Sequence, residues 1–161
     1  MAFVEVVADL DSLSYLFTNF NHNIIEMNPT VRNILAVLAG AIIGGVVNMA
    51  LIMSGPLFIE FPEGFNPEDQ QSLIEYMPKF EFKHFIMPFL AHAIGTLVGA
   101  IIAVKIGASR KLTLALIIGA LFFIGGAMNV AMLNAPMWFN ITDLVLAYFP
   151  MAYLGWKLAD K

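Results

Sequence analysis

Cysteine is absent from the 161 residues of this chain. The chain therefore has no disulfide, no thiolate metal site and no cysteine nucleophile. Charged residues are scarce as well, at 12% of the sequence, whereas soluble domains carry about 25%. This scarcity excludes an ordinary soluble domain. The net charge of −4 gives no reason to expect nucleic acid as a partner, and we predict none.

The short motifs of common catalytic sites are missing too. The sequence has no Gly-x-Ser-x-Gly, no His-Glu-x-x-His and no glycine-rich phosphate loop. His84 and His92 lie about 12 Å apart along one predicted helix, so they cannot both ligate one haem iron without a second subunit. We therefore predict no enzymatic activity, no metal site and no cofactor.

Long apolar runs dominate what is present. The sequence is 60% hydrophobic and has a mean hydropathy of +0.80. Charged residues are absent from 33–59, 84–104 and 112–142, and each gap exceeds the ~18 residues that mark a transmembrane helix. The sequence predicts an all-α fold, a four-helix transmembrane bundle over residues 28–161. Its spans are expected at about 29–54, 84–104, 112–133 and 138–156.

The ends of two spans carry specific signals. Asn28 suits an N-cap and Pro29 the first helical position, where a missing N–H costs nothing. Trp138 and Trp156 are separated by about 27 Å of helix, which matches the thickness of a bilayer core. Both tryptophans are therefore expected to anchor the fourth span at the two interfaces.

Basic residues gather on one side of these spans. They are Arg32, Lys105, Arg110, Lys111, Lys157 and Lys161. Cytoplasmic loops are rich in Lys and Arg, so we expect a multi-pass protein of the inner membrane with both termini cytoplasmic. The opposite side holds the acidic loop 55–83, in which Lys79 and Lys83 weaken the bias slightly.

Two segments outside the spans have patterns of their own. Residues 66–69 (Asn-Pro-Glu-Asp) combine an N-cap, a proline and first-turn acids, and predict a short helix over about 67–77. Residues 1–27 are predicted to form an amphipathic segment, because apolar residues recur in it with helical spacing. Its polar face is acidic, which favours docking on protein over binding to anionic lipid. Met27 is an alternative start, so this segment is also interpreted as an upstream extension.

One motif occurs twice. Residues 43–50 read Ile-Gly-Gly-Val-Val-Asn-Met-Ala, and residues 124–131 read Ile-Gly-Gly-Ala-Met-Asn-Val-Ala. A weaker match relates Leu-Ala-His at 90–92 to Leu-Ala-Tyr at 146–148. The bundle is therefore predicted to be a duplicated two-helix hairpin, with its halves related by an axis along the membrane normal.

Small residues are spaced so that helices can approach closely. Gly40 and Gly44 share a helical face with Asn48, and a similar stripe follows the second span. Such stripes pack helices in membranes through van der Waals contact and amide hydrogen bonds. The predicted packing set is Gly40, Gly44, Gly95, Gly99 and Gly126.

Five polar residues fall in the outer half of the predicted bilayer, counted at ~1.5 Å of rise per residue. They form a candidate binding or packing layer: Asn48, His92, Asn129, Asp143 and Tyr148. His92 carries the functional hypothesis, because an ionisable side chain inside a span is functional by default and histidine changes charge near neutral pH. A neutral His92 bonded to Asn48 or Asn129 is the alternative.

The other members of this layer also have structural interpretations. The two asparagines would hold helices together. Asp143 would cap the start of the fourth helix, and Tyr148 would be a core aromatic residue. Pro88 and Pro150 are expected to kink spans two and four, and to open room beside His92 and Tyr148.

From Asn28-Pro29-Thr30 through Gly155, the chain resembles a group of small, uncharacterised four-span bacterial membrane proteins. Members of this group typically begin near the position of Met27. The resemblance implies the four-span topology and supplies no activity and no site residues. The size and span count are also similar to those of small multidrug resistance transporters, but this chain lacks the glutamate that those proteins carry in their first span.

Two function classes follow from these features. The primary prediction is a non-enzymatic membrane scaffold or accessory subunit in the lipid bilayer. Its glycine faces and asparagines would assemble it as a homo-oligomer or within a larger membrane complex. The alternative is a small transporter or channel with a polar cavity around His92. Four helices enclose little pathway, so transport would require a homodimer.

Overall fold

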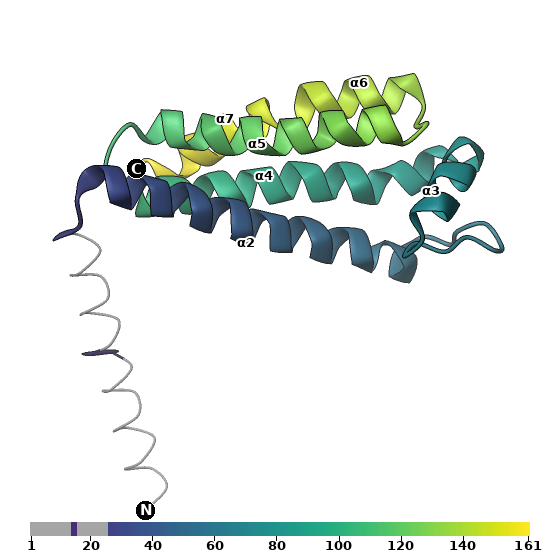
Figure 1. Ribbon diagram of the computed structural model, residues 1–161, viewed down its shortest axis with the longest axis horizontal. Helices are drawn as coiled ribbons and strands as arrows, with labels where there is room; N and C mark the ends of the chain where they lie inside the picture. Colours follow the sequence, from purple (N-terminus) through teal and green to yellow (C-terminus); the bar gives the residue numbers. More distant parts are fainter. Residues whose placement is uncertain (1–13, 16–25) are drawn as a thin grey trace, which may run out of the picture.

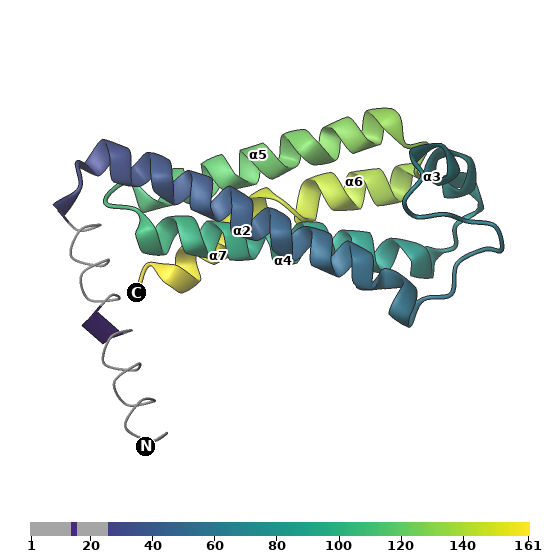
Figure 2. The same ribbon diagram turned by 60° about the horizontal axis from the view of Figure 1, so that its bottom comes forward.

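The computed structural model describes residues 14–15 and 26–161, and within these ranges the chain is helical and contains no strand. The long helices run side by side along the longest axis of the molecule (Figures 1 and 2). The loop that carries the short helix α3 (Gln70–Tyr76) lies at one end of them. Most of the amphipathic segment predicted for 1–27 lies outside the described residues.

The first long helix is α2 (Pro29–Phe58). The side chain of Asn28 accepts a hydrogen bond from the backbone N–H of Thr30, which starts the helix as the sequence predicts. The helix runs past its predicted end at 54 and includes Pro56. A proline this close to a helix end removes a single intrahelical hydrogen bond, so it does not stop the helix.

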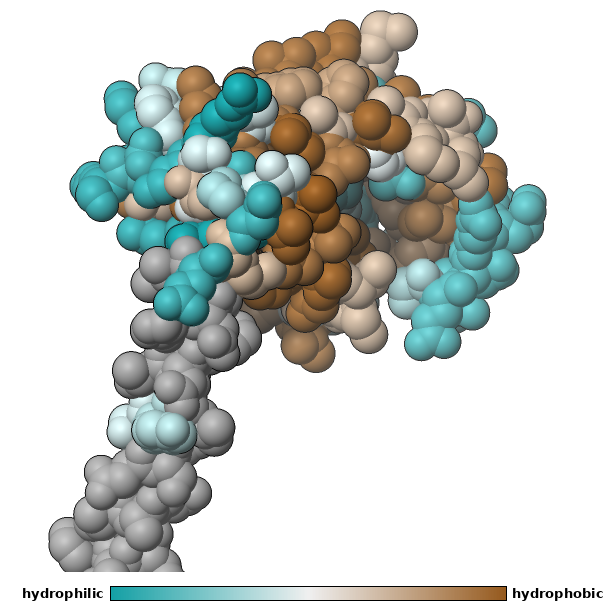
Figure 3. Space-filling model, turned by 60° about the vertical axis from the view of Figure 1, so that its left-hand side comes forward, coloured by the Kyte–Doolittle hydropathy of each residue, from teal (hydrophilic) through white to brown (hydrophobic). Residues whose placement is uncertain are grey.

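Three helices in the described part of the chain are long and apolar enough to cross a membrane. They are Pro29–Phe58, Phe82–Ile106 and Lys111–Met132. The second joins a short 3-10 turn to α4 (Ile86–Ile106), and the third is α5. Figure 3 shows hydrophobic side chains over the middle of the molecule, with hydrophilic ones toward both sides of the view. These features indicate a membrane protein.

Helices α2 and α4 pack through glycines. A Cβ added at Gly40 would lie 2.5 Å from the carbonyl oxygen of Gly99, and one at Gly44 would lie 2.6 Å from that of Gly95. Real Cβ atoms do not approach backbone oxygens so closely, so only glycine allows these backbones to meet. The predicted glycine faces therefore pack two helices of the same chain against each other. Helix α4 also contacts α5 and the last helix.

The last apolar segment is divided into two helices, α6 (Met137–Leu146) and α7 (Phe149–Ala159). The break ends at Tyr148, which has φ −112° and ψ −80°. The sequence predicts a kink from Pro150, but the structure places Pro150 in the first turn of α7, where its missing N–H removes no bond. Pro88 likewise lies in the first turn of α4, which continues unbroken to Ile106.

In the loop after α2, the short helix α3 begins at Gln70, three residues later than predicted. The reason is the identity of the N-cap. The carboxylate of Asp69 accepts from the backbone N–H groups of Gln71 and Ser72, whereas Asn66 closes a separate turn. Glu68 and Asp69 therefore precede the helix and do not lie in its first turn.

His84 fixes this loop to the start of α4. Its Nδ1 accepts a hydrogen bond from the backbone N–H of Glu81 at 2.8 Å, so Nε2 carries the proton and donates to the carbonyl oxygen of Glu60 at 3.1 Å. The rings of Phe61 and Phe80 lie 5.2 and 5.0 Å from the imidazole. An aromatic cluster thus covers this end of the helices.

The opposite end is closed by the turn 107–110 between α4 and α5. Nε of Arg32 donates to the carbonyl oxygen of Ile106 at 2.6 Å. Lys111 and Asp160 form an ion pair at 3.1 Å that ties the start of α5 to the end of α7. The hydrogen bond from Lys111 lowers the pKa of the Asp160 carboxyl below its ordinary value.

Candidate functional site

The break between α6 and α7 buries a carboxyl group and a phenol beside each other. Asp143 lies in the last turn of α6 and is 3% exposed, while Tyr148 lies at the break and is 1% exposed. The Tyr148 hydroxyl donates to Oδ2 of Asp143 at 2.7 Å. The interpretation of Asp143 as a helix cap is wrong. Pro136 ends the preceding turn and α6 starts at Met137, which places Asp143 inside the helix.

Helix α4 supplies the third member of this cluster, His92. Its Nδ1 lies 2.9 Å from both carboxylate oxygens of Asp143 and 3.0 Å from the Tyr148 oxygen. A carboxylate can only accept a hydrogen bond. Nδ1 therefore carries a hydrogen atom and donates a hydrogen bond to Asp143. Nε2 makes no hydrogen bond to any described residue. Nε2 is therefore the ring nitrogen that is left open to a water or a ligand.

Gly126 makes the space that the Tyr148 hydroxyl occupies. A Cβ added at Gly126 would overlap that hydroxyl and the ring carbon that bears it. In the first copy of the repeated motif, the buried glycine is Gly44, and Gly45, the counterpart of Gly126, has no described atom within 4 Å of an added Cβ. The two copies of the motif therefore use opposite glycines for packing.

A cavity of about 240 Å³ lies between the loop after α2, here called the aromatic loop, and the cluster of His92 and Asp143. Its polar floor is formed by His92, Asn129, Asn140 and Asp143. The walls are aromatic and aliphatic, and they include Phe61, Phe65, Leu73, Met77, Phe80, Phe85 and Phe139. The same cavity is therefore lined by aromatic residues of the loop and by the buried carboxylate.

A second cavity of about 420 Å³ lies between α2 and α5 and meets the first one. His92, Gly126 and Asn129 line both cavities, and Asn48 and Tyr148 line the second. Within the described residues, Oδ1 of Asn48 is buried and accepts no hydrogen bond. A buried amide oxygen without a partner requires a donor from a water or a ligand.

The structure thus brings three of the five predicted polar residues into direct contact, namely His92, Asp143 and Tyr148. Asn48 and Asn129 line the adjoining cavities. His92 bonds Asp143 and Tyr148 instead of an asparagine, so the alternative in which an asparagine satisfies His92 does not describe this geometry.

Sequence reasoning missed the aromatic walls of the first cavity. The signal was present as phenylalanines at 61, 65, 80 and 85. Their convergence depends on tertiary folding, because the segment from 58 to 85 has no regular spacing of apolar residues.

Among the described residues, 14–15 and 26–161, no group of three His, Cys, Asp or Glu side chains is arranged to hold a metal ion. Comparisons with protein-family models, with curated proteins and with solved structures find no match to this chain. The chemistry of the site is therefore inferred from its own residues.

Proposed function

We propose that the protein is a small four-span membrane transporter that exchanges a proton for a small organic cation at His92, Asp143 and Tyr148. In this proposal α2, α4, α5 and the α6–α7 pair each cross the membrane once, and the two hairpins are duplicated halves. The buried Asp143 carboxylate at the end of a cavity is the observation that carries the proposal. Carboxylates inside membrane proteins characteristically mark ion or proton pathways.

The walls of the cavity favour a cation. Phe61, Phe65 and Phe80 line the passage above the carboxylate, and aromatic faces attract cations electrostatically. The cavity volume of about 240 Å³ lies below the ~300–1,000 Å³ of pockets for drug-sized ligands. The substrate class is therefore a small amine or quaternary ammonium with an apolar substituent.

Proton exchange follows from the pairing of His92 with Asp143. When both imidazole nitrogens carry protons, the pair is neutral and no charge attracts a second cation. When Nε2 has released its proton to water in the cavity, the pair carries one negative charge, which an organic cation neutralises. One cation thus binds for each proton released. Tyr148 keeps the carboxylate oriented in both states through its hydroxyl.

A homodimer would complete the pathway. Helix α2 packs mainly on α4 and touches α5 little, so the cavity that holds Asn48 opens sideways between α2 and α5. A second copy against this opening would close it and complete the surroundings of the Asn48 amide. Both termini face the cytoplasm in this proposal, because the basic residues gather at the end of the helices opposite the aromatic loop.

The test uses the full chain in proteoliposomes with a pH-sensitive dye inside. Addition of benzyltrimethylammonium outside is expected to raise the internal pH, because the cation enters as protons leave. Asp143→Asn and His92→Gln should abolish the response. Tyr153→Phe, a change on the exposed side of α7, should leave it at the wild-type level. Absence of a response in folded wild-type protein, or an unchanged response in Asp143→Asn, would overturn the proposal.

An accessory or self-assembling module is the second candidate function. Gly45 and Gly125 have no described atom within 4 Å of an added Cβ, so each offers a flat surface on which another helix can pack closely. Gly45→Leu and Gly125→Leu should then lower the oligomer mass in detergent without unfolding the protein. An unchanged mass in both variants would count against this candidate.

A further inference from the structure

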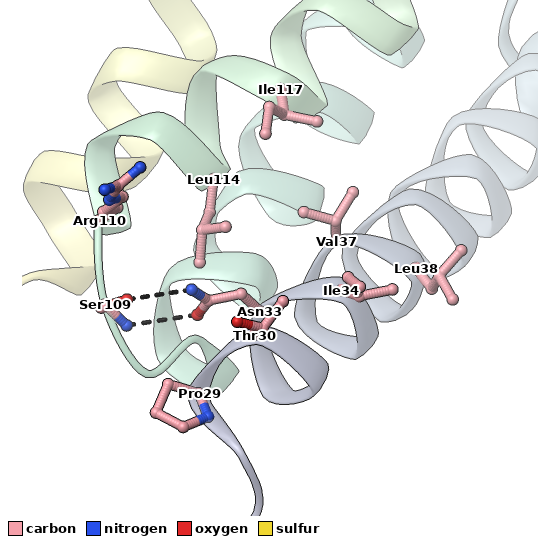
Figure 4. Close-up of a pocket in the computed structure, with 10 residues that line it drawn as sticks. All are labelled: Pro29, Thr30, Asn33, Ile34, Val37, Leu38, Ser109, Arg110, Leu114 and Ile117. Atoms are coloured by element: carbon pink, nitrogen blue, oxygen red, sulfur yellow. Dashed lines mark hydrogen bonds between the residues drawn. The ribbon is translucent and has the colours of Figure 1, made fainter.

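A cavity larger than the two described above lies away from the His92 cluster, at the other end of the same helices. It has a volume of about 630 Å³ and lies between the starts of α2 and α5 (Figure 4). One part is polar, with Thr30, Ser109 and Arg110. The remainder is apolar and is lined by Ile34, Val37, Leu38, Leu114 and Ile117.

The polar part is built on Asn33. Its Oδ1 accepts from the backbone N–H groups of Ala108 and Ser109 at 2.8 and 3.3 Å, and its Nδ2 donates to Ser109 Oγ at 3.1 Å. Figure 4 shows the two bonds between Asn33 and Ser109, which join α2 to the turn. Because Ser109 Oγ accepts from Asn33, its own hydroxyl proton remains available for a ligand. The turn is thus fixed in place before any ligand arrives.

Arg110 supplies a positive charge that no described residue compensates. Two neighbouring cations have partners, since Arg32 donates to Ile106 and Lys111 pairs with Asp160. The guanidinium of Arg110 makes no hydrogen bond and no ion pair within 14–15 and 26–161. It lies at the polar end of an apolar groove, so the groove matches a ligand that is anionic at one end and apolar at the other.

We propose that this groove binds one anionic phospholipid. The phosphate would lie against Arg110, with Ser109 as a further donor, since guanidinium groups bind phosphate through paired N–H groups. One acyl chain would follow Ile34, Leu38 and Ile117, which are all exposed. A free anion would leave this apolar half unoccupied. The groove is also continuous with the apolar surface of α2 and α5, two helices that are apolar enough to span a membrane. The proposal is independent of transport at His92.

Native mass spectrometry of the purified full chain tests this proposal. The protein is exchanged into detergent with dioleoylphosphatidylglycerol or, separately, dioleoylphosphatidylcholine. Wild type is expected to retain one phosphatidylglycerol per chain and to lose phosphatidylcholine. Arg110→Gln should weaken phosphatidylglycerol binding by about fivefold, the effect of one interfacial basic residue. Lys157→Gln, which removes an exposed cation from α7, is the matched control and should bind as wild type does.

A second variant separates lipid binding from folding. Arg110 adopts φ 49°, a conformation that glycine accepts more readily than arginine. Arg110→Gly should therefore keep the wild-type melting temperature and still weaken phosphatidylglycerol binding by about fivefold. Equal losses in Arg110→Gln and Lys157→Gln would overturn the site in favour of diffuse surface charge. Displacement of the lipid by inorganic phosphate at equal concentration would overturn it in favour of a free-anion site.

Discussion

Nδ1 of His92 lies 2.9 Å from both carboxylate oxygens of Asp143, although the two residues are 51 positions apart in the chain. This contact joins the middle of α4 to the last turn of α6. It places an imidazole N–H directly against a buried carboxylate, where electrostatic attraction is stronger than in bulk water. Tyr148 completes the pair from the adjoining helix break.

Removal of the Tyr148 hydroxyl should destabilise the protein. Tyr148→Phe deletes a hydrogen bond to a buried carboxylate, and bonds to charged groups contribute roughly 1.5–3 kcal/mol. The free energy of unfolding should fall by that amount in denaturant titrations. Tyr153→Phe, on an exposed tyrosine of α7, should stay within about 0.5 kcal/mol of wild type. Equal effects of the two substitutions would contradict the buried network.

The two adjacent glycines of the first motif should respond oppositely to alanine. Gly44→Ala places a Cβ 2.6 Å from the Gly95 carbonyl oxygen, and such overpacking costs roughly 1–3 kcal/mol. Gly45→Ala meets open space among the described residues and should stabilise α2 by up to about 1 kcal/mol, because alanine favours helix. Thermal unfolding of both variants measures the difference, and destabilisation of equal size would refute this α2–α4 contact.

Gly126 and Tyr148 should be energetically coupled. Gly126→Ala overlaps the Tyr148 hydroxyl, so it should destabilise wild type more than a Tyr148→Leu background. A double-mutant cycle should give a coupling energy of about 0.5–3 kcal/mol. Gly125→Ala in the same two backgrounds is the control, because an added Cβ at Gly125 meets no described atom within 4 Å. Additive effects at Gly126 would show that the two residues do not touch.

The Lys111–Asp160 pair should give a pH-dependent contribution to stability. The pKa of the Asp160 carboxyl is lowered in the folded state, so the stabilisation is present above the unfolded-state value. It is lost as the pH falls through the lower folded-state value. The melting temperature of wild type should exceed that of Asp160→Asn at neutral pH, and this difference should shrink at about pH 3. A difference that persists in acid, or one that Lys111→Met does not remove, would contradict the ion pair.

The sequence was sufficient to predict the helical class, because gaps between charged residues mark long apolar helices directly. It also predicted the start of α2, where Asn28 caps the helix. It could not place the break before Phe149, since Pro150 is compatible both with a kink inside one helix and with the first turn of a new helix. The start of α6 at Met137 lies one residue before the predicted start of the fourth span, at about 138.

The sequence predicted which residues belong to the site, but not which of them form hydrogen bonds with one another. Counting residues along each span brings His92, Asp143 and Tyr148 to similar depths, but depth alone does not say which helix faces which. Packing of α4 against α6 and α7 decides that His92 meets Asp143. The walls contributed by Phe61, Phe65 and Phe80 arise from loop folding that no local pattern encodes.

Proton release on cation binding tests proton–cation exchange at His92 most directly. Benzyltrimethylammonium is titrated into the purified protein by calorimetry in phosphate and in Tris, and the difference in heat gives the protons released per cation. At neutral pH, wild type should release up to one proton per cation. His92→Gln should release none. Binding to wild type without proton release, or equal release from His92→Gln, would contradict exchange at His92.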